Sequence, residues 1–93
     1  MQIKSSRPAD AIKSASNALE VDGLTDADRA KAYYRRGQAY GKCKEDELAV
    51  EDLKRALEII PEDAGVLGEL NAAKQRIKMR REREKKAYAK MFS

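Results

Sequence analysis

The chain has 93 residues, which is enough for one small domain. Charged residues make up 39% of it and hydrophobic residues 42%, so its hydrophobic content exceeds that of a typical disordered chain of high charge. Because Ala, Lys, Glu, Leu and Arg dominate and β-branched residues are few, the composition predicts an all-α protein.

The residue types that are missing exclude several kinds of chemistry. Without histidine there is no Ser-His or Cys-His catalytic pair, and the commonest zinc ligand is lacking. The single cysteine, Cys43, can form no internal disulfide, and we expect it to be buried or half-buried in a reducing compartment. No Gly-rich phosphate loop or nucleophile–base pair is present, so the sequence predicts neither an enzyme nor a bound cofactor. No apolar run approaches the ~20 residues of a membrane span, and residues 1–7 do not resemble a secretory signal, so we expect a cytoplasmic protein.

The first helix is predicted from Pro8 to about Val21. Ser6 is a suitable N-cap, and proline is favoured in the first turn, where its missing N–H group costs nothing. Gly23 can adopt the left-handed conformation that ends many helices. One face is apolar at helical spacing and consists of Ala11, Ile12, Ala15, Ala18 and Leu19.

The second helix is predicted from Asp26 to Lys42, with Thr25 as its N-cap. Gly37 lies in its interior, where glycine costs about 1 kcal/mol relative to alanine. Because a missing side chain lets two backbones come close, we expect another helix to pack against Gly37. The rest of the inner stripe is formed by Ala30, Tyr33 and Tyr40.

The third helix is predicted from Asp46 to about Ile60, because Pro61 disfavours helical geometry in the residue before it. The fourth is predicted from Asp63 to Lys90, a length of roughly 42 Å. Its first half has an apolar stripe and is expected to pack, whereas its second half is densely charged and is expected to project into solvent. The inward residues of the two helices are Ala49, Val50, Leu53, Ala56 and Leu57, followed by Val66, Leu67, Leu70 and Ala73.

The positive charge of the chain is concentrated at its end. Residues 1–73 have 11 Lys and Arg against 14 Asp and Glu, whereas residues 74–93 have 9 against 2. Three interpretations remain open: a solvated extension, a helix that calmodulin binds through apolar anchors such as Tyr88 and Met91, and a surface for nucleic acid or anionic membranes. The third is the least favoured, because no aromatic stacking platform or helix-turn-helix pattern accompanies the charge. The candidate residues for anion or calmodulin binding are Lys74, Arg76, Lys78, Arg80, Arg81, Arg83, Lys85 and Lys86.

An internal repeat relates the first helix to the third. Shifting the chain by 38 residues places Ala11 and Ile12 on Ala49 and Val50, and it places the segment 18–20 on the segment 56–58. The two helices are therefore copies of one element. The second helix has no copy upstream, so the chain contains about one and a half helix hairpins followed by a terminal helix.

The stretch 30–63 resembles a tetratricopeptide repeat, a hairpin of two helices in 34 residues. In such a repeat, small residues let the two helices pack closely, large residues fill the space between them, and proline ends the second helix. Arg36 and Lys44 depart from the leucine and glycine that are usual at their positions. The residues at the signature spacing are Ala30, Tyr33, Gly37, Tyr40, Ala49, Leu53, Ala56 and Pro61.

This resemblance implies tetratricopeptide-repeat hairpins with a long C-terminal capping helix. We expect residues 1–25 to be the second helix of an incomplete repeat plus a linker, 26–61 a complete last repeat, and 62–93 the long basic helix. The segments 31–37 and 84–93 are similar to large immunophilins of the cyclophilin-40 type, with the FK506-binding immunophilins as near relatives. That similarity implies a longer peptidyl-prolyl cis-trans isomerase whose catalytic domain would lie outside this chain.

Two cations on the second helix are the candidate binding residues. Lys31 and Arg35 are four residues apart, so they share one helix face and can hold a carboxylate together, arginine as a fork and lysine as a mobile charge. The resemblance implies that they belong to the carboxylate clamp of a co-chaperone, which holds the acidic C-terminal peptide of heat-shock protein 90 and also uses Lys and Asn of earlier repeats. The alternative is a solvated face that pairs with Asp28 and other local acids. Arg36 is instead expected to lie over apolar surface with its guanidinium in water.

A third function class is self-association. In the sequence the face formed by Ile12, Ala15 and Leu19 lacks a hairpin partner, and repeat proteins usually need about three repeats to bury a continuous core. An exposed apolar face of this kind favours a dimer or a domain-swapped pair.

Overall fold

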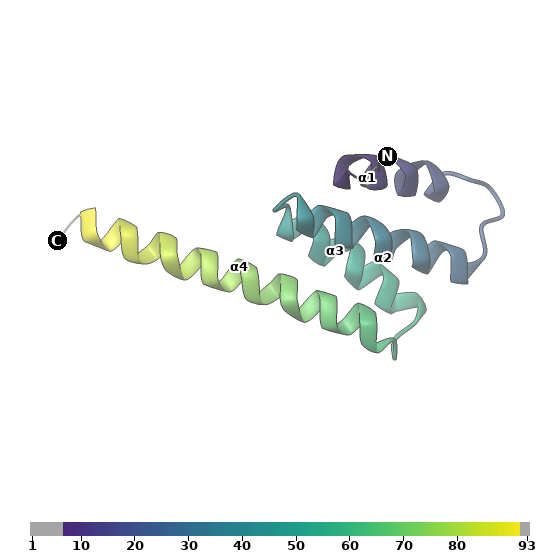
Figure 1. Cartoon of the computed structure of the whole chain (residues 1–93). Helices are drawn as coiled ribbons and strands as arrows, with labels where there is room; N and C mark the ends of the chain where they lie inside the picture. Colours follow the sequence, from purple (N-terminus) through teal and green to yellow (C-terminus); the bar gives the residue numbers. More distant parts are fainter. Residues whose placement is uncertain (1–6, 92–93) are drawn as a thin grey trace, which may run out of the picture.

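The computed structural model describes residues 7–91, which form four α-helices and no strand. The helices are α1 (Pro8–Leu19), α2 (Asp26–Lys42), α3 (Asp46–Ile59) and α4 (Ala64–Met91). Consecutive helices pack side by side and α2 also touches α4, whereas within residues 7–91 the first helix contacts α2 alone (Figure 1). The predicted all-α fold is confirmed.

The first helix is shorter than predicted. It begins at Pro8, as expected, with Arg7 in the N-cap position and no side-chain hydrogen bond there, while Ser6 lies outside the described residues. It ends at Leu19, because the chain then turns away toward Gly23, whose φ of +77° lies in the left-handed region. Glycine reaches this region without steric cost, but the C-cap of α1 is Glu20, so Gly23 turns the linker and the prediction that it ends the helix is wrong.

Side chains cap the second and fourth helices. The hydroxyl of Thr25 accepts the backbone N–H of Asp28 at 3.1 Å, which confirms Thr25 as the N-cap of α2. The carboxylate of Asp63 accepts the backbone N–H of Val66 at 3.0 Å. Asp63 therefore caps α4 rather than forming its first residue.

The third helix lies between a strained turn and a proline. Lys44, in the turn before it, has a φ of +64°, the conformation in which glycine is usual and other residues are rare. The helix ends at Ile59, shortly before Pro61, as the restriction on residues before proline predicts.

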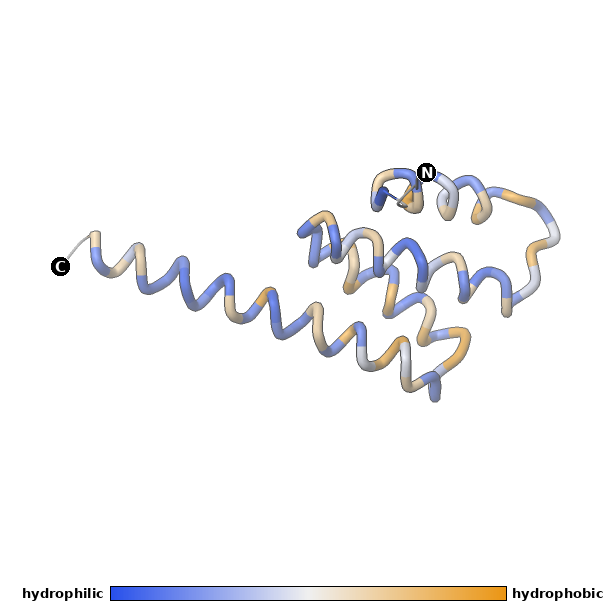
Figure 2. The backbone as a smooth tube through the Cα atoms, in the orientation of Figure 1, coloured by the Kyte–Doolittle hydropathy of each residue, from blue (hydrophilic) through white to orange (hydrophobic). Residues whose placement is uncertain are grey.

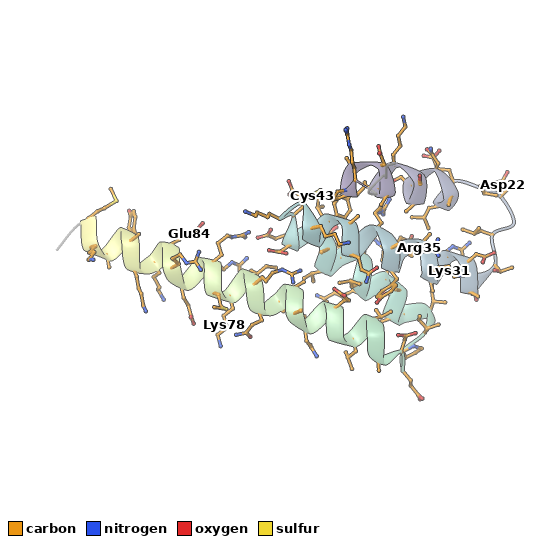
Figure 3. The ribbon with its side chains drawn as sticks, in the orientation of Figure 1. Asp22, Lys31, Arg35, Cys43, Lys78 and Glu84 are labelled. Carbon is orange, nitrogen blue, oxygen red and sulfur yellow. The ribbon has the colours of Figure 1, made fainter. Side chains whose placement is uncertain are left out.

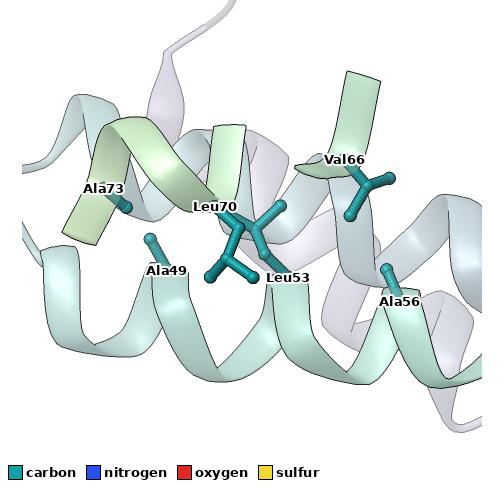
Figure 4. Close-up of a cluster of buried hydrophobic side chains, with 6 residues drawn as sticks. All are labelled: Ala49, Leu53, Ala56, Val66, Leu70 and Ala73. Carbon is teal, nitrogen blue, oxygen red and sulfur yellow. The ribbon is translucent and has the colours of Figure 1, made fainter. Parts of the chain in front are cut away.

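The hydrophobic core lies between α3 and α4. Leu53 of α3 also occupies the space that Gly37 of α2 leaves open, because a Cβ atom on Gly37 would lie 2.9 Å from the Leu53 Cγ. The close approach predicted at Gly37 is thus confirmed, and it brings α2 against α3. The six buried side chains of this cluster between α3 and α4 are those of Ala49, Leu53, Ala56, Val66, Leu70 and Ala73 (Figure 4).

The fourth helix is longer than the bundle against which it packs. Its first half covers α3, whereas residues 81–91 are exposed and extend beyond the other helices (Figure 1). This outer part is largely hydrophilic (Figure 2). Within the part of the chain that the structure describes, no helix is both long enough and apolar enough to span a membrane.

Candidate functional site

The helix that carries the candidate binding residues, α2, is bordered on three sides. The side with Gly37 packs on α3, Ala32 lines the boundary with α1, and Gly41 lies under Arg76 of α4. A stripe between the α1 side and the α4 side stays open to solvent. Its residues follow a spacing of four, three and four, and they are Lys31, Arg35, Gln38 and Lys42, of which Gln38 is half-buried and the other three are exposed.

Lys31 and Arg35 are both exposed, one turn apart on this open stripe (Figure 3). Within residues 7–91 neither side chain has a hydrogen bond or an ion pair. The nearby acid Asp26 pairs instead with Arg29, at 3.1 Å. The pairing with Asp28 that the alternative reading expected is therefore not formed in this part of the chain, and both cations can receive a ligand.

A hollow of about 400 Å³ lies beside the two cations, between α1 and α2. Small side chains dominate its wall, so it offers apolar surface next to two positive charges. An acidic residue with an apolar neighbour fits this combination. The lining residues are Ala11, Ser14, Ala15, Ala18, Leu24, Asp28, Lys31, Ala32 and Arg35.

The face of α1 that was expected to be uncovered is only partly open. Ala15 is buried, while Ile12 and Leu19 are half-buried, because α2 packs against this side of the helix. The open part lies at Ala11 and Ala18, in the hollow beside the cations. Self-association through α1 stays a prediction, which light scattering would test.

Arg36 does not place its guanidinium in water, so that prediction is wrong. Its Nε donates to Asp52 Oδ2 at 2.6 Å and its Nη2 to Asp52 Oδ1 at 2.9 Å, while its Nη1 donates to Ser16 Oγ at 3.0 Å. Its Cζ lies 5.7 Å and 5.9 Å from the ring centroids of Tyr33 and Tyr40. The hydrogen bond to Asp52 raises the pKa of Arg36 above its ordinary value.

This network links three helices behind the open stripe of α2. Ser16 belongs to α1, Arg36 to α2 and Asp52 to α3. Successive residues of a helix point about 100° apart, so Arg35 can face the solvent while Arg36 faces inward. The sequence contained a signal for this network. Arg36 stands where the repeat usually has a buried leucine, and an arginine at such a position needs an acid as its partner.

Two basic residues of α4 pair with acids of α3. Arg76 Nε donates to Asp46 Oδ1 at 2.8 Å, and Arg80 donates to Glu47. A hydrogen bond from its own backbone N–H and the one from Arg80 lower the pKa of Glu47. These pairs hold the middle of α4 against α3. The predicted projection into solvent therefore applies only to the outer part of the helix, residues 81–91. The exposed basic candidates are Lys74, Lys78, Arg81, Arg83, Lys85 and Lys86.

A larger hollow, of about 910 Å³, lies where α4 passes the start of α3. Val50, Ile77 and Tyr88 give it an apolar part. The charged lining residues are Glu47, Lys74, Lys78, Arg81, Glu82, Glu84 and Lys85. The outer half of α4 thus combines apolar anchor positions with positive charge.

The prediction of a buried or half-buried Cys43 is wrong, because this side chain is exposed. Cys43 is the C-cap residue of α2, where the backbone turns toward α3, and no helix within residues 7–91 covers it. Its backbone N–H bonds to the carbonyl of Ala39 at 3.1 Å, so the main chain rather than the side chain serves the fold here.

Comparison with known proteins identifies the repeat. Residues 30–63 match the model of the tetratricopeptide repeat family. A peptidyl-prolyl cis-trans isomerase D of Cryptococcus neoformans var. neoformans serotype D is 49% identical over 77 residues, which are 83% of this chain and 20% of that protein. The protein of the same name from Mycosarcoma maydis is 52% identical over 67 residues, 72% of this chain and 17% of that protein.

The chain therefore spans about a fifth of the length of these curated relatives. The match at 30–63 begins in the second turn of α2, includes all of α3 and ends just before α4. Residues 30–63 are thus a tetratricopeptide repeat, and the chain is similar to a region of the peptidyl-prolyl cis-trans isomerases D, as the sequence resemblance indicated.

Proposed function

We propose that this chain is the protein-interaction module of a cytoplasmic co-chaperone and binds the acidic C-terminal peptide of heat-shock protein 90. The observation that supports this is the pair Lys31 and Arg35, exposed side by side and without an acidic partner in residues 7–91. The tetratricopeptide repeat that carries the pair belongs to a family of protein-binding hairpins.

The chemistry of the pair suits a carboxylate. The Arg35 guanidinium offers two parallel N–H donors, and the Lys31 ammonium adds a charge that can follow the ligand. The hollow beside them accepts an apolar side chain next to the acid. Behind them, the bonds of Arg36 to Asp52 hold α2 in place, so the two cations keep their relative position.

The expected affinity is low. A few exposed charge contacts amount to about 5 kcal/mol, which corresponds to a Kd of roughly 100 µM or weaker. The remaining clamp residues of the family come from earlier repeats, which would raise the affinity of a longer protein.

Calorimetry with an acidic peptide tests the proposal. The peptide with a free C-terminal carboxylate should bind, whereas the Lys31→Ala and Arg35→Ala variants should lose most of the affinity. Lys54→Ala is the matched control, since Lys54 is an exposed lysine of α3 away from the hollow and should leave binding unchanged. Micromolar binding that survives the combined Lys31→Ala and Arg35→Ala substitutions would refute the clamp.

The relatives are named isomerases, and this chain shares about a fifth of their length. We assign the isomerase activity of a longer protein to a part outside the shared region. The helices described here would then bring a partner to that activity rather than perform it.

The outer half of α4 supports a second candidate function, calmodulin binding. Tyr88 is 64% exposed and Met91 is 76% exposed, and both stand among basic residues on a helix that extends beyond the bundle. Exposed apolar anchors on a basic helix are what calmodulin recognises. Calcium-dependent comigration with calmodulin tests this candidate, and comigration that does not depend on calcium would exclude it.

A further inference from the structure

The open stripe of α2 continues past the candidate clamp. Beyond Lys31 and Arg35, one further turn brings Gln38 and then Lys42 to the same face of the helix. A third hollow, of about 190 Å³, lies at this end of the stripe, between α2 and α4. Its lining residues are Gln38, Gly41, Lys42, Glu69 and Arg76.

Arg76 brings unused hydrogen-bond donors to this hollow. Its Nε donates to Asp46, but no residue of the described chain accepts a hydrogen bond from its Nη1 or Nη2. The guanidinium lies across Gly41, since a Cβ atom there would be 2.9 Å from Arg76 Nη2. Glycine at this position is therefore what admits the arginine.

Lys42 supplies a second positive charge at the same place. Its side chain is exposed and has no hydrogen bond or ion pair within residues 7–91. The one acid of the lining, Glu69, is engaged by Gln38, whose Nε2 donates to Glu69 Oε2 at 3.2 Å. The hollow thus presents the charge of Lys42 and the open N–H donors of Arg76, which is ion-paired with Asp46 through its Nε, next to Glu69, which accepts from a neutral amide.

We propose that Lys42 and Arg76 form a second carboxylate subsite for the same acidic peptide, an inference that rests on the proposed function. From the midpoint of Lys31 and Arg35 to Lys42 is about 13 Å along the axis of α2, at 1.5 Å per residue. An extended peptide covers about 3.3 Å per residue. An acid about four residues before the C-terminal residue of the peptide therefore reaches Lys42 when the terminal carboxylate is held at Lys31 and Arg35.

Two matched peptides test this subsite in calorimetric titrations. One peptide has Glu about four residues before its C-terminal residue, and the other has Gln at that position. The Glu peptide should bind wild-type protein about threefold to fivefold more tightly, the gain expected of one exposed charge contact. In the Lys42→Gln variant this difference in affinity should disappear, because the Glu side chain of the peptide no longer has the lysine charge as its partner.

Two further variants separate the subsite from general charge effects. Gly41→Ala should also remove the preference for Glu, because the added Cβ displaces the Arg76 guanidinium. Lys54→Gln lowers the net charge equally but lies on α3, so it should keep the preference. Circular dichroism of each variant verifies that the helices are retained.

The outcomes distinguish the two proposals. Loss of binding in the Lys31→Ala and Arg35→Ala variants, with equal binding of the two peptides by wild type, would overturn the second subsite and leave the clamp intact. A preference for Glu that persists in both Lys42→Gln and Gly41→Ala would also overturn it. Binding that is indifferent to Lys31 and Arg35 would overturn the clamp itself.

Discussion

The Arg36→Met substitution should destabilise the fold much more than the removal of an ordinary surface charge. Methionine keeps much of the aliphatic stem but removes the N–H groups that bond to Asp52 and Ser16. The Asp52 side chain is only 2% exposed and would keep a single hydrogen bond, from Arg55 Nη1 at 3.1 Å. A carboxylate would thus remain buried with one half-exposed partner.

The expected loss of unfolding free energy depends on which of the two charges remains buried without its partner. Removal of one partner from a buried ion pair costs about 3–5 kcal/mol, and the remaining Arg55 reduces this to about 2–4 kcal/mol for Arg36→Met. Asp52→Leu should cost about 1–3 kcal/mol, because the Arg36 side chain is already 18% exposed and can turn to water. The double variant leaves no buried charge, so it should lie within about 1 kcal/mol of wild type.

Urea unfolding followed by circular dichroism measures these free energies of unfolding. A chain of this length has a total stability of about 5–14 kcal/mol, so each variant should remain measurable. Arg29→Met is the control, since Arg29 and Asp26 are a surface pair, 41% and 82% exposed, whose loss should cost less than about 0.5 kcal/mol. The reasoning fails if Arg36→Met is as mild as Arg29→Met, or if the double variant loses the sum of the two single losses.

Gly37→Ala should destabilise the protein by about 1 kcal/mol, because overpacking against Leu53 costs about 1–3 kcal/mol and alanine returns about 1 kcal/mol of helix propensity. A Cβ at Gly68 meets nothing within 4 Å, so Gly68→Ala should stabilise it, and unfolding curves that shift in the same direction for both variants would contradict the close packing. Because the pKa of Glu47 is lowered in the folded protein, its charged side chain stabilises the fold at pH values above the ordinary pKa of 4.5. This stabilisation is lost as the pH falls through the lower pKa of the folded state. The stability difference between wild type and Glu47→Gln should therefore be constant between about pH 6 and 8 and shrink at about pH 3, and a difference that persists in acid would exclude the contact with Arg80 as its source.

Local signals in the sequence were enough to predict the helices. The Thr25 hydroxyl and the restriction imposed by Pro61 each act within a few residues, so these two helix ends lie close to their predicted positions, whereas α1 ends before Gly23. The packing at Gly37 was also predictable, because glycine inside a helix has a cost that a close neighbour explains. The exposure of Cys43 could not be predicted, because it depends on where the turn between α2 and α3 lies relative to the other helices.

The two adjacent arginines show where sequence reasoning about the site stopped. The spacing of Lys31 and Arg35 correctly placed both on one exposed face. For Arg36 the same reasoning failed, because its partner Asp52 lies in the next helix and only tertiary packing brings the two together. The extension of the stripe to Lys42 followed the same spacing as the clamp, but its significance depends on Arg76, which α4 brings from far along the chain.

The positive stripe exists although residues 1–73 contain more acids than bases. Two acids of α3 are engaged away from the stripe, because Asp52 and Asp46 are buried against Arg36 and Arg76, whereas Asp28 and Glu69 lie in the hollows beside it. An acidic ligand therefore meets a local charge opposite to that of this part of the chain as a whole. Because the buried pairs position α2 and α4 relative to α3, the same contacts that stabilise the fold also keep its outer face free for a carboxylate.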